Sequence, residues 1–260
     1  MSIWHQLDAV EVLQQLDTNA DRGLSQAEVA LRLQQYGLNE LTEQPGESLW
    51  KIFWKQLTAV MVVVLLVAAL ISLALQDYIN ATAIFAIVAF NAMLGVRQEY
   101  QAGQAIAALK KLAVSTVKVR RDDRVQEISA RQLVPGDIVL LETGNLVAAD
   151  YRLLETANLR IQESSLTGEA ESTVKQSQPL EWGESVGEPP VEVALADRPT
   201  MAYMGTTIPY GRGSGVVTET GNQTELGRIA TAIQTVKPKP TPLEQRLDQL
   251  GVRLAIITLV

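Results

Sequence analysis

The chain has 260 residues, of which 47% are hydrophobic and 20% are charged, and its formal net charge is −7. The acidic balance argues against a nucleic-acid partner, since such proteins usually present a basic surface. The absence of cysteine excludes disulfides, thiolate zinc sites and cysteine nucleophiles. The single histidine, His5, lies near the N-terminus, where we expect a mobile segment, and this argues against a histidine-based triad or a histidine-rich metal site.

Residues 1–48 are predicted to form a small helical unit. An apolar stripe indicates a first helix over 8–16. A second helix is expected to begin at Ser25, because Ser25 and Glu28 have the spacing of a capping box. Gly37 is then placed to end that helix, since glycine favours the left-handed conformation of helix C-caps.

Two long apolar segments follow this unit. Residues 56–76 and 78–96 carry no charged side chain, and a helix of either length reaches about 30 Å, the thickness of a bilayer core. The alternative is a pair of helices in a soluble core, but the rest of the chain is too short to cover two helices that are apolar on all sides. The sequence therefore predicts a transmembrane hairpin over 49–98, with spans at about 57–76 and 78–96.

Positive charges flank only one side of this hairpin. Lys51 and Lys55 precede the first span and Arg97 follows the second, while the connecting loop has no basic residue. The positive-inside rule places the N-terminus and everything after Arg97 in the cytosol. Three polar side chains of the second span are expected to face protein rather than lipid: Asn80, Thr82 and Asn91. For Asn91 we favour a hydrogen bond between helices over a role as an ion ligand.

The helical pattern continues to Leu112, which predicts a stalk that leaves the membrane. From Ser115 the apolar period changes to two, and turn residues separate the short apolar runs, so we expect a compact all-β domain of about eight short strands. Runs late in this domain lie at 151–155, 159–162, 201–204 and 215–219. An acidic segment over 179–199 is expected to be an exposed loop, and a helix is predicted over 225–235.

Residues 237–260 are predicted to hold a proline-rich linker and the start of a third membrane helix. The apolar run that ends at Val260 is too short to cross a bilayer. We therefore expect the chain to be a fragment of a larger protein.

Two other features are similar to ligand sites. The glycine-rich string over 211–215 has the look of a phosphate-binding loop, but no P-loop lysine follows it, and a β-turn is expected instead. Four carboxylates of the acidic segment lack the spacing of a calcium loop, so a solvated loop is expected there too. They belong to Glu181, Glu184, Glu188 and Glu192.

The most informative string is Ser-Ser-Leu-Thr-Gly-Glu over 164–169, directly after a predicted strand. A glutamate on a turn that contains glycine is well suited to present a carboxylate and to orient a water molecule. Taken alone, the string is typical of an ordinary surface turn. Its context is given by further strings at 135–139, 149–154, 204–206 and 241–244.

In this order, and together with the hairpin and stalk, these strings resemble the N-terminal third of a P-type ATPase. The similarity is greatest to the type II cation pumps, the group that contains calcium pumps, and it covers essentially all 260 residues. It implies a mixed fold, in which a membrane hairpin carries a cytosolic actuator domain of the β-barrel or jelly-roll type. The stalk and actuator would cover 99–236, packed with residues 1–48.

The resemblance also implies a chemical role for the loop. In these pumps ATP phosphorylates an aspartate on a separate domain, and Glu169 would position and activate the water that hydrolyses the aspartyl phosphate, with Thr167 and Gly168 shaping the loop. The sites for ATP and Mg²⁺ are expected outside these 260 residues. The phosphorylation motif Asp-Lys-Thr-Gly-Thr does not occur in the chain, so we expect the fragment to be inactive alone.

The implied partners are the lipid bilayer, the transported cation, and the phosphorylation domain, nucleotide-binding domain and later membrane helices of the same pump. Rotation of the actuator is expected to pull on the stalks near Lys55, 98–112 and 243–254 and so to couple hydrolysis to transport. A multi-pass membrane protein follows, and we prefer the plasma membrane of a prokaryote because no targeting segment is recognisable. The alternative is a non-enzymatic, membrane-anchored β domain that binds a partner.

The sequence departs from the family pattern around the loop. Gln162 stands where aspartate is usual, and Ala170 stands where serine commonly follows. Asn145 and Ala148 replace the usual aspartate and proline of an earlier turn. Each change can loosen the support of the loop without touching Glu169. Near the first span, calcium pumps of this group carry acidic residues for ion entry, whereas this chain has Lys51, Lys55, Thr58 and Ala59. The sequence leaves the ion, its direction and its stoichiometry open.

Overall fold

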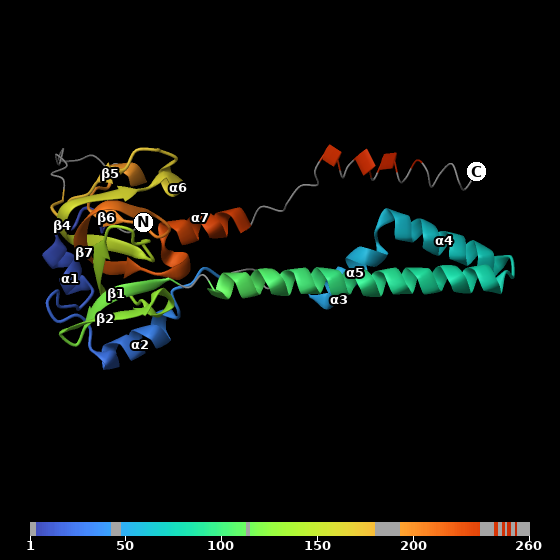
Figure 1. Ribbon diagram of the computed structural model, residues 1–260, viewed down its shortest axis with the longest axis horizontal. Coiled ribbons are helices and arrows are strands. Elements are labelled where there is room, and N and C mark those ends of the chain that lie inside the picture. Colours follow the sequence, from blue (N-terminus) through green and yellow to red (C-terminus); the bar gives the residue numbers. More distant parts are fainter. Residues whose placement is uncertain are drawn as a thin grey trace, which may run out of the picture. The chain divides into compact units, whose positions relative to one another are not determined.

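The computed structural model describes residues 4–42, 48–112, 115–179 and 193–234, and seven positions between 242 and 253. The chain divides into two compact units, one made of 1–43 with 114–236 and the other of 44–113 with 237–260 (Figure 1). Most of the expected exposed loop, with its four glutamates, lies outside the described residues. Most of the expected linker and third membrane helix lies outside them too.

The first unit is built on one antiparallel sheet of seven strands. Their order is β2-β1-β3-β7-β4-β5, and β6 pairs with β4 (Figure 1). The bounds are β1 Thr116–Arg121, β2 Arg124–Ser129, β3 Ile138–Glu142, β4 Asp150–Gln162, β5 Thr173–Val174, β6 Met201–Ala202 and β7 Thr207–Glu219. Two of these strands are long rather than short, since β4 and β7 have 13 residues each.

Strand β4 joins two runs that the sequence separates, at 151–155 and 159–162. The alternation of side chains is lost between them because the register against β7 shifts between Ala157 and Arg160, where Asn158 adopts a φ of 52°. Such bulges bend a strand without ending it. The predicted set of about eight short strands is therefore wrong in its lengths, although the expected β domain itself is confirmed.

The glycine-rich string over 211–215 lies inside β7, so the predicted β-turn is wrong. A Cβ atom built on Gly211 would lie 2.3 Å from the carbonyl oxygen of Asn158, and one on Gly213 would lie 2.4 Å from that of Glu155. Glycine at these two positions lets the backbones of β4 and β7 approach closely. The string serves strand packing.

The N-terminal helices α1 (Ala9–Gln15) and α2 (Gln26–Tyr36) pack against this sheet. Val12 of α1 is fully buried with Ile138 and Val216 of the sheet. Near α2, the buried side chains of Leu24 and Val29 cluster with Val134. Burial of apolar side chains against the sheet thus holds both helices in place.

Local capping signals set the ends of these helices. The predicted capping box of α2 is confirmed, because the Ser25 hydroxyl accepts from the backbone N–H of Glu28, whose carboxylate accepts from that of Ser25. Gly37 ends α2 with a φ of 77°. In α1, Asp8 and Glu11 form a second capping box.

His5 is buried, contrary to the expected mobile terminus. The hydroxyl of Thr200 donates a hydrogen bond of 2.9 Å to the His5 carbonyl oxygen, and the buried guanidinium of Arg152 donates one of 2.9 Å to that of Leu7. Burial lowers the pKa of His5 to about 4, and the positive charges of Arg198 and Arg152 act in the same direction. The segment that contains His5 is therefore anchored to the sheet with a neutral imidazole at pH 7.

Asn39, just beyond α2, is another buried anchor. Its side-chain amide donates to the carbonyl oxygens of Ala130 and Ala148, at 2.9 Å each. Its side-chain oxygen accepts from the backbone N–H of Gly221 at 2.8 Å. One carboxamide therefore joins three segments that are distant in sequence.

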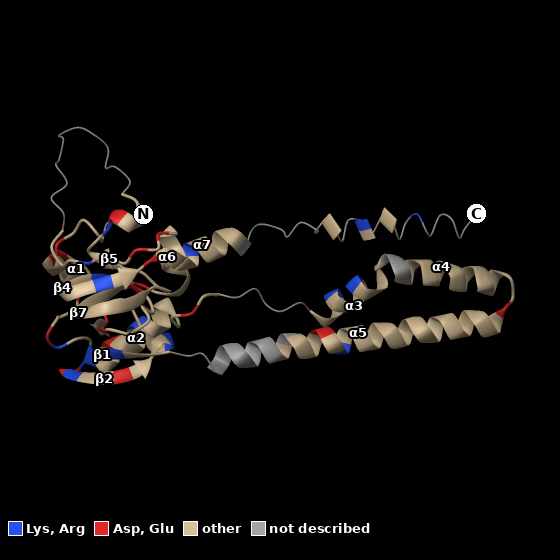
Figure 2. Cartoon of the chain, turned by 45° about the horizontal axis from the view of Figure 1, so that its top comes forward, with Lys and Arg blue, Asp and Glu red and all other residues tan. Residues whose placement is uncertain are grey.

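The second unit holds helices α3 (Leu49–Leu57), α4 (Val60–Ala74) and α5 (Tyr78–Leu112). Charged side chains are absent from α4 and sparse along α5 (Figure 2). The segment Tyr78–Ala102 of α5 is long and apolar enough to cross a membrane, and α3 with α4 adds a second candidate if the bent pair counts as one span. That pair is bent by 64°. The break falls at Thr58, whose hydroxyl donates to the carbonyl of Trp54.

Helices α3 and α4 both contact α5, and small side chains are buried in this unit. Ala69, Ala81 and Ala92 are buried, and Gly95 leaves room for the side chain of Gln56, which would lie about 3 Å from a Cβ there. Three polar residues of α5 are exposed in this unit, and the expectation that they face protein rather than lipid stays a prediction: Asn80, Thr82 and Asn91.

Candidate functional site

The loop that follows β4 is a short, tightly bonded turn. Helix α6 (Ser164–Thr167) occupies a single turn and ends at Gly168, which adopts the left-handed conformation with a φ of 79°. Apart from Gly168 and its two chain neighbours, no described residue has an atom within 4 Å of the position a Cβ would take at Gly168, so backbone conformation and not space favours glycine there. Glu169 then leaves the turn with an exposed side chain.

Thr167 bonds both sides of this turn. Its hydroxyl donates to the carbonyl oxygen of Glu163 at 3.1 Å and accepts from the backbone N–H of Glu169 at 3.2 Å. The structure thus brings Thr167, Gly168 and Glu169 together in one turn. The backbone N–H of Glu169 is bonded, while its side chain is exposed.

Gln162 and Ala170, the two departures from the family pattern next to the loop, contact each other. The side-chain amide of Gln162 donates a hydrogen bond of 2.8 Å to the carbonyl oxygen of Ala170. This bond ties the end of the loop back to β4. The change from aspartate to glutamine therefore provides a donor where the expectation was a loss of support.

The two other departures also keep defined contacts. Asn145 accepts from the backbone N–H of Glu142 through its side-chain oxygen, at 2.9 Å. The backbone N–H of Ala148 donates to the hydroxyl of Tyr151 at 3.0 Å. Both contacts close the turn between β3 and β4.

A buried ion pair lies beneath the loop. The ammonium of Lys175 is 2.7 Å from a carboxylate oxygen of Glu163, and the two side chains are 0% and 2% exposed. Burial raises the pKa of Glu163 and lowers that of Lys175, and the attraction between the two opposes both shifts. The sequence analysis missed both residues, and the only signal for them is a charged residue at an inward position next to a strand.

Asp150, at the start of β4, connects the loop region to helix α7 (Glu225–Gln234). Its carboxylate accepts from the backbone N–H groups of Met204 and Glu225, at 2.8 Å each. The adjacent carbonyl of Gly205 accepts a 3.2 Å bond from the hydroxyl of Ser165 in α6. Burial raises the pKa of Asp150 to about 7, and the charges of Glu219 and Glu225 add to the rise against the two backbone bonds.

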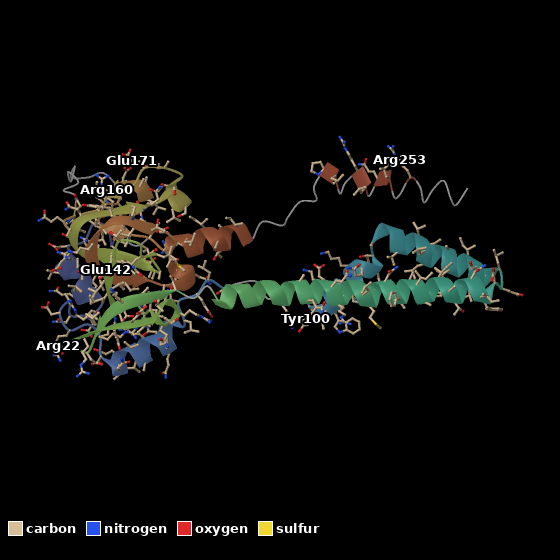
Figure 3. All side chains as sticks on the ribbon, viewed as in Figure 1. Arg22, Tyr100, Glu142, Arg160, Glu171 and Arg253 are labelled. Atoms are coloured by element: carbon tan, nitrogen blue, oxygen red, sulfur yellow. The ribbon has the colours of Figure 1, made fainter. Side chains whose placement is uncertain are left out.

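Exposed charges flank the site on the surface of the same unit. Arg160, on β4, and Glu171, two residues after Glu169, are both exposed and are labelled in Figure 3. The structure shows no buried partner for the carboxylate of Glu171 among the residues it describes. Glu171 is therefore a matched control for Glu169.

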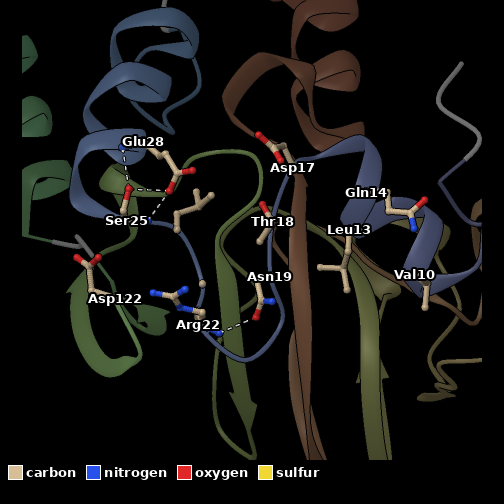
Figure 4. Close-up of a pocket in the computed structure, with 12 residues that line it drawn as sticks. Val10, Leu13, Gln14, Asp17, Thr18, Asn19, Arg22, Ser25, Glu28 and Asp122 are labelled. Carbon is tan, nitrogen blue, oxygen red and sulfur yellow. Dashed lines mark hydrogen bonds between the residues drawn. The ribbon is translucent and has the colours of Figure 1, made fainter.

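A hollow of about 640 Å³ lies between α1, α2 and the turn after β1 (Figure 4). Some of its polar groups are paired with each other, because Ser25 bonds Glu28 and the Asn19 side chain accepts from the backbone of Arg22. None of its lining residues belongs to the loop around Glu169.

Within the part of the chain that the structure describes, no three carboxylate or histidine side chains are grouped to hold a metal ion.

The antiparallel sheet and the loop that carries Glu169 agree with the family models that match this chain. The family model described as the P-type ATPase actuator domain matches residues 111–234, and that described as the N-terminus of cation transporters and ATPases matches residues 4–72. The chain belongs to the P-type ATPase family, and residues 111–234 form its actuator domain.

Several bacterial calcium- and cation-transporting ATPases are similar to this chain along nearly its whole length. A "Calcium-transporting ATPase 1" of Bacillus cereus is 39% identical over 99% of this chain and 28% of its own length. A calcium-transporting ATPase of Listeria monocytogenes is 37% identical over 95% of this chain and 27% of its own length. "Cation-transporting ATPase pma1" of Synechocystis is 37% identical over 98% of this chain and 27% of its own length. The chain thus spans little more than a quarter of these relatives.

Proposed function

We propose that this chain is the actuator and first membrane hairpin of an ATP-driven cation pump, and that Glu169 promotes hydrolysis of its aspartyl-phosphate intermediate. The observation that carries the proposal is the exposed carboxylate of Glu169 on a turn whose backbone is bonded on both sides. A turn with a bonded backbone and an exposed carboxylate is suited to positioning a water molecule. Such positioning supplies much of the catalysis in phosphoryl transfer.

In the proposed step, water attacks the phosphorus atom of the aspartyl phosphate. The bond between phosphorus and the aspartate oxygen breaks, which releases inorganic phosphate and the aspartate carboxylate. Glu169 orients the attacking water and accepts its proton. ATP is the substrate of the earlier phosphorylation, and the sites for ATP and Mg²⁺ belong to the rest of the pump, so no step in this chain runs through the metal.

The membrane parts complete the proposal. Residues 49–98 form the hairpin, with spans at about 57–76 and 78–96, and residues 1–48 and 99–236 lie on the cytosolic side of a prokaryotic plasma membrane. Rotation of the actuator pulls on the stalks near Lys55, 98–112 and 243–254, which couples hydrolysis to transport. The chain alone is proposed to be inactive. The names of the Bacillus and Listeria relatives make Ca²⁺ the first cation to test.

The test is made in the intact pump with Glu169→Gln, which removes the basic oxygen and keeps the size of the side chain. Phosphoenzyme should form from ATP and accumulate, while steady-state ATP hydrolysis should fall by about 100-fold or more. Glu171→Gln is the matched control, and it should turn over like the parent. Normal ATP hydrolysis by Glu169→Gln would overturn the assignment.

A further inference from the structure

The ion pair between Glu163 and Lys175 is the most deeply buried pair of charges near the loop. Its two side chains are almost fully excluded from solvent. Lys175 has further contacts, since its ammonium lies 3.5 Å from the carbonyl oxygen of Arg198 and 6.0 Å from the centre of the Tyr203 ring. A buried charge is costly unless it is paired, so each partner depends on the other for its place.

The backbone of Glu163 supports the whole turn of α6. Its carbonyl oxygen accepts three hydrogen bonds, from the backbone N–H groups of Leu166 and Thr167, at 2.9 Å each, and from the hydroxyl of Thr167. That hydroxyl in turn accepts from the backbone N–H of Glu169. A continuous series of contacts therefore leads from the ammonium of Lys175 to the backbone of Glu169.

Lys175 is also fixed independently of the loop. Its backbone N–H donates to the carbonyl oxygen of Leu159 in β4 at 2.9 Å, next to the β4–β5 pairing. The ammonium therefore reaches Glu163 from the rigid sheet. The sheet, through Lys175, therefore fixes the direction in which the carbonyl group of Glu163 points.

We propose that Glu163 and Lys175 are positioning residues, which hold the turn so that the carboxylate of Glu169 meets the aspartyl phosphate and its attacking water. The inference rests on the proposed function of Glu169. Neither residue contacts the reacting atoms. Their effect is on the rate of phosphoenzyme decay, through the orientation of Glu169.

A merely structural role is the competing interpretation, and the same sheet offers a matched control. Arg121 and Asp137 form a second buried ion pair, with two contacts of 2.8 and 2.6 Å and side chains 4% and 0% exposed. This pair supports the turn before β3, where the Asp137 carboxylate also accepts from the backbone of Val134. Among the described residues this pair makes no hydrogen bond to α6, so its loss should reduce stability without changing the decay of phosphoenzyme that has formed.

The experiment measures the decay rate of phosphoenzyme in the intact pump after a chase with unlabelled ATP, so that the amount of folded protein cancels. Lys175→Met should slow decay by about 10- to 100-fold, the effect of a small misplacement of a catalytic group. The phosphoenzyme of Arg121→Met should decay at the parental rate. If Lys175→Met does not fold, the double variant Glu163→Leu with Lys175→Met removes both charges and leaves none unpaired. Its phosphoenzyme should decay slowly as well. A parental rate of phosphoenzyme decay in the folded variant would overturn the proposal.

Hydrogen exchange on the 260-residue chain gives a second readout that needs no turnover. Lys175→Met, or the double variant, should speed exchange at the α6 amides of Leu166 and Thr167 more than at the amides of the sheet, and equal changes at both would contradict positioning. Glu169→Gln separates the two proposals. If the phosphoenzyme of Glu169→Gln decays at the parental rate, the proposed function fails. If it decays slowly while the phosphoenzyme of Lys175→Met decays at the parental rate, only this inference fails.

Discussion

The side-chain amide of Gln162 donates a hydrogen bond of 2.8 Å to the carbonyl oxygen of Ala170, across the base of the loop that carries Glu169. Both residues differ from those that P-type ATPases usually carry at these places. The bond joins the last residue of β4 to the residue after Glu169. It thus closes the loop outside the bonds made by Thr167, which lie between residues 163 and 169.

Removal of this bond should loosen the loop and leave the sheet intact. Gln162→Ala loses a partly exposed hydrogen bond worth about 1 kcal/mol, so phosphoenzyme decay should slow by about 3- to 10-fold. Gln162→Asp, with the residue usual in the family, is shorter and has no amide donor, and it should behave like the alanine variant. Faster decay in Gln162→Asp than in the parent would show that the bond does not support the loop.

Asn39 should be a major determinant of the stability of the first unit. Asn39→Ala leaves three buried backbone groups without their partner, of Ala130, Ala148 and Gly221, and should cost about 2–4 kcal/mol. The check is thermal unfolding of the chain in detergent. Asn222→Ala is the control, because its bonds to Thr42 are exposed and water can replace them.

The environment of Asp150 should make stability fall as the pH rises. Its pKa is 3.8 as a free side chain and about 7 when folded, so the folded state binds an extra proton between these values. The free energy of unfolding should therefore decrease from about pH 4 to 7, against a smaller opposing contribution from His5, whose lowered pKa favours the fold as the pH rises from about 4 to 6.5.

Asp150→Asn isolates this contribution. The variant has a single side-chain oxygen to accept from Met204 and Glu225, so it should be less stable than the parent at pH 5, by about 1–2 kcal/mol. The difference should shrink by pH 8, where the parent holds a buried carboxylate. A difference that is independent of pH would show that Asp150 has an ordinary pKa.

The close approach of β4 and β7 predicts a graded effect of glycine substitutions. Gly211 and Gly144 both have a positive φ, of 88° and 91°, but only a Cβ on Gly211 would collide with backbone, at the carbonyl of Asn158. Gly144→Ala should cost about 1–2 kcal/mol from conformation alone, and Gly211→Ala should cost clearly more. Equal melting temperatures for the two variants would argue against the strand geometry at Gly211.

Local signals made the helices of the first unit predictable. The capping box at Ser25 and the stop at Gly37 act within a few residues, so the sequence around them determines where α2 begins and ends. The long strands were not predictable in the same way. The bulge at Asn158 interrupts the alternation that marks a strand, and the continuity of β4 depends on its pairing with β7.

The same distinction applies to the site. The turn with Thr167, Gly168 and Glu169 is contiguous, so the string itself indicated it. The support of that turn is tertiary: Lys175 meets Glu163 only because β5 folds back on β4, and Asn39 reaches Gly221 from the other end of the chain. Expected effects of Gln162 and Ala170 were judged one at a time, and their mutual hydrogen bond appears only when both are placed.

The most direct test of the account is the decay of phosphoenzyme after an ATP chase in the intact pump, with Glu169→Gln compared with Glu171→Gln. Glu169→Gln should form phosphoenzyme normally, and this phosphoenzyme should decay at least about 100-fold more slowly than that of the parent. The phosphoenzyme of Glu171→Gln should decay at the parental rate. Equal decay in the two variants would contradict the role of Glu169 in hydrolysis.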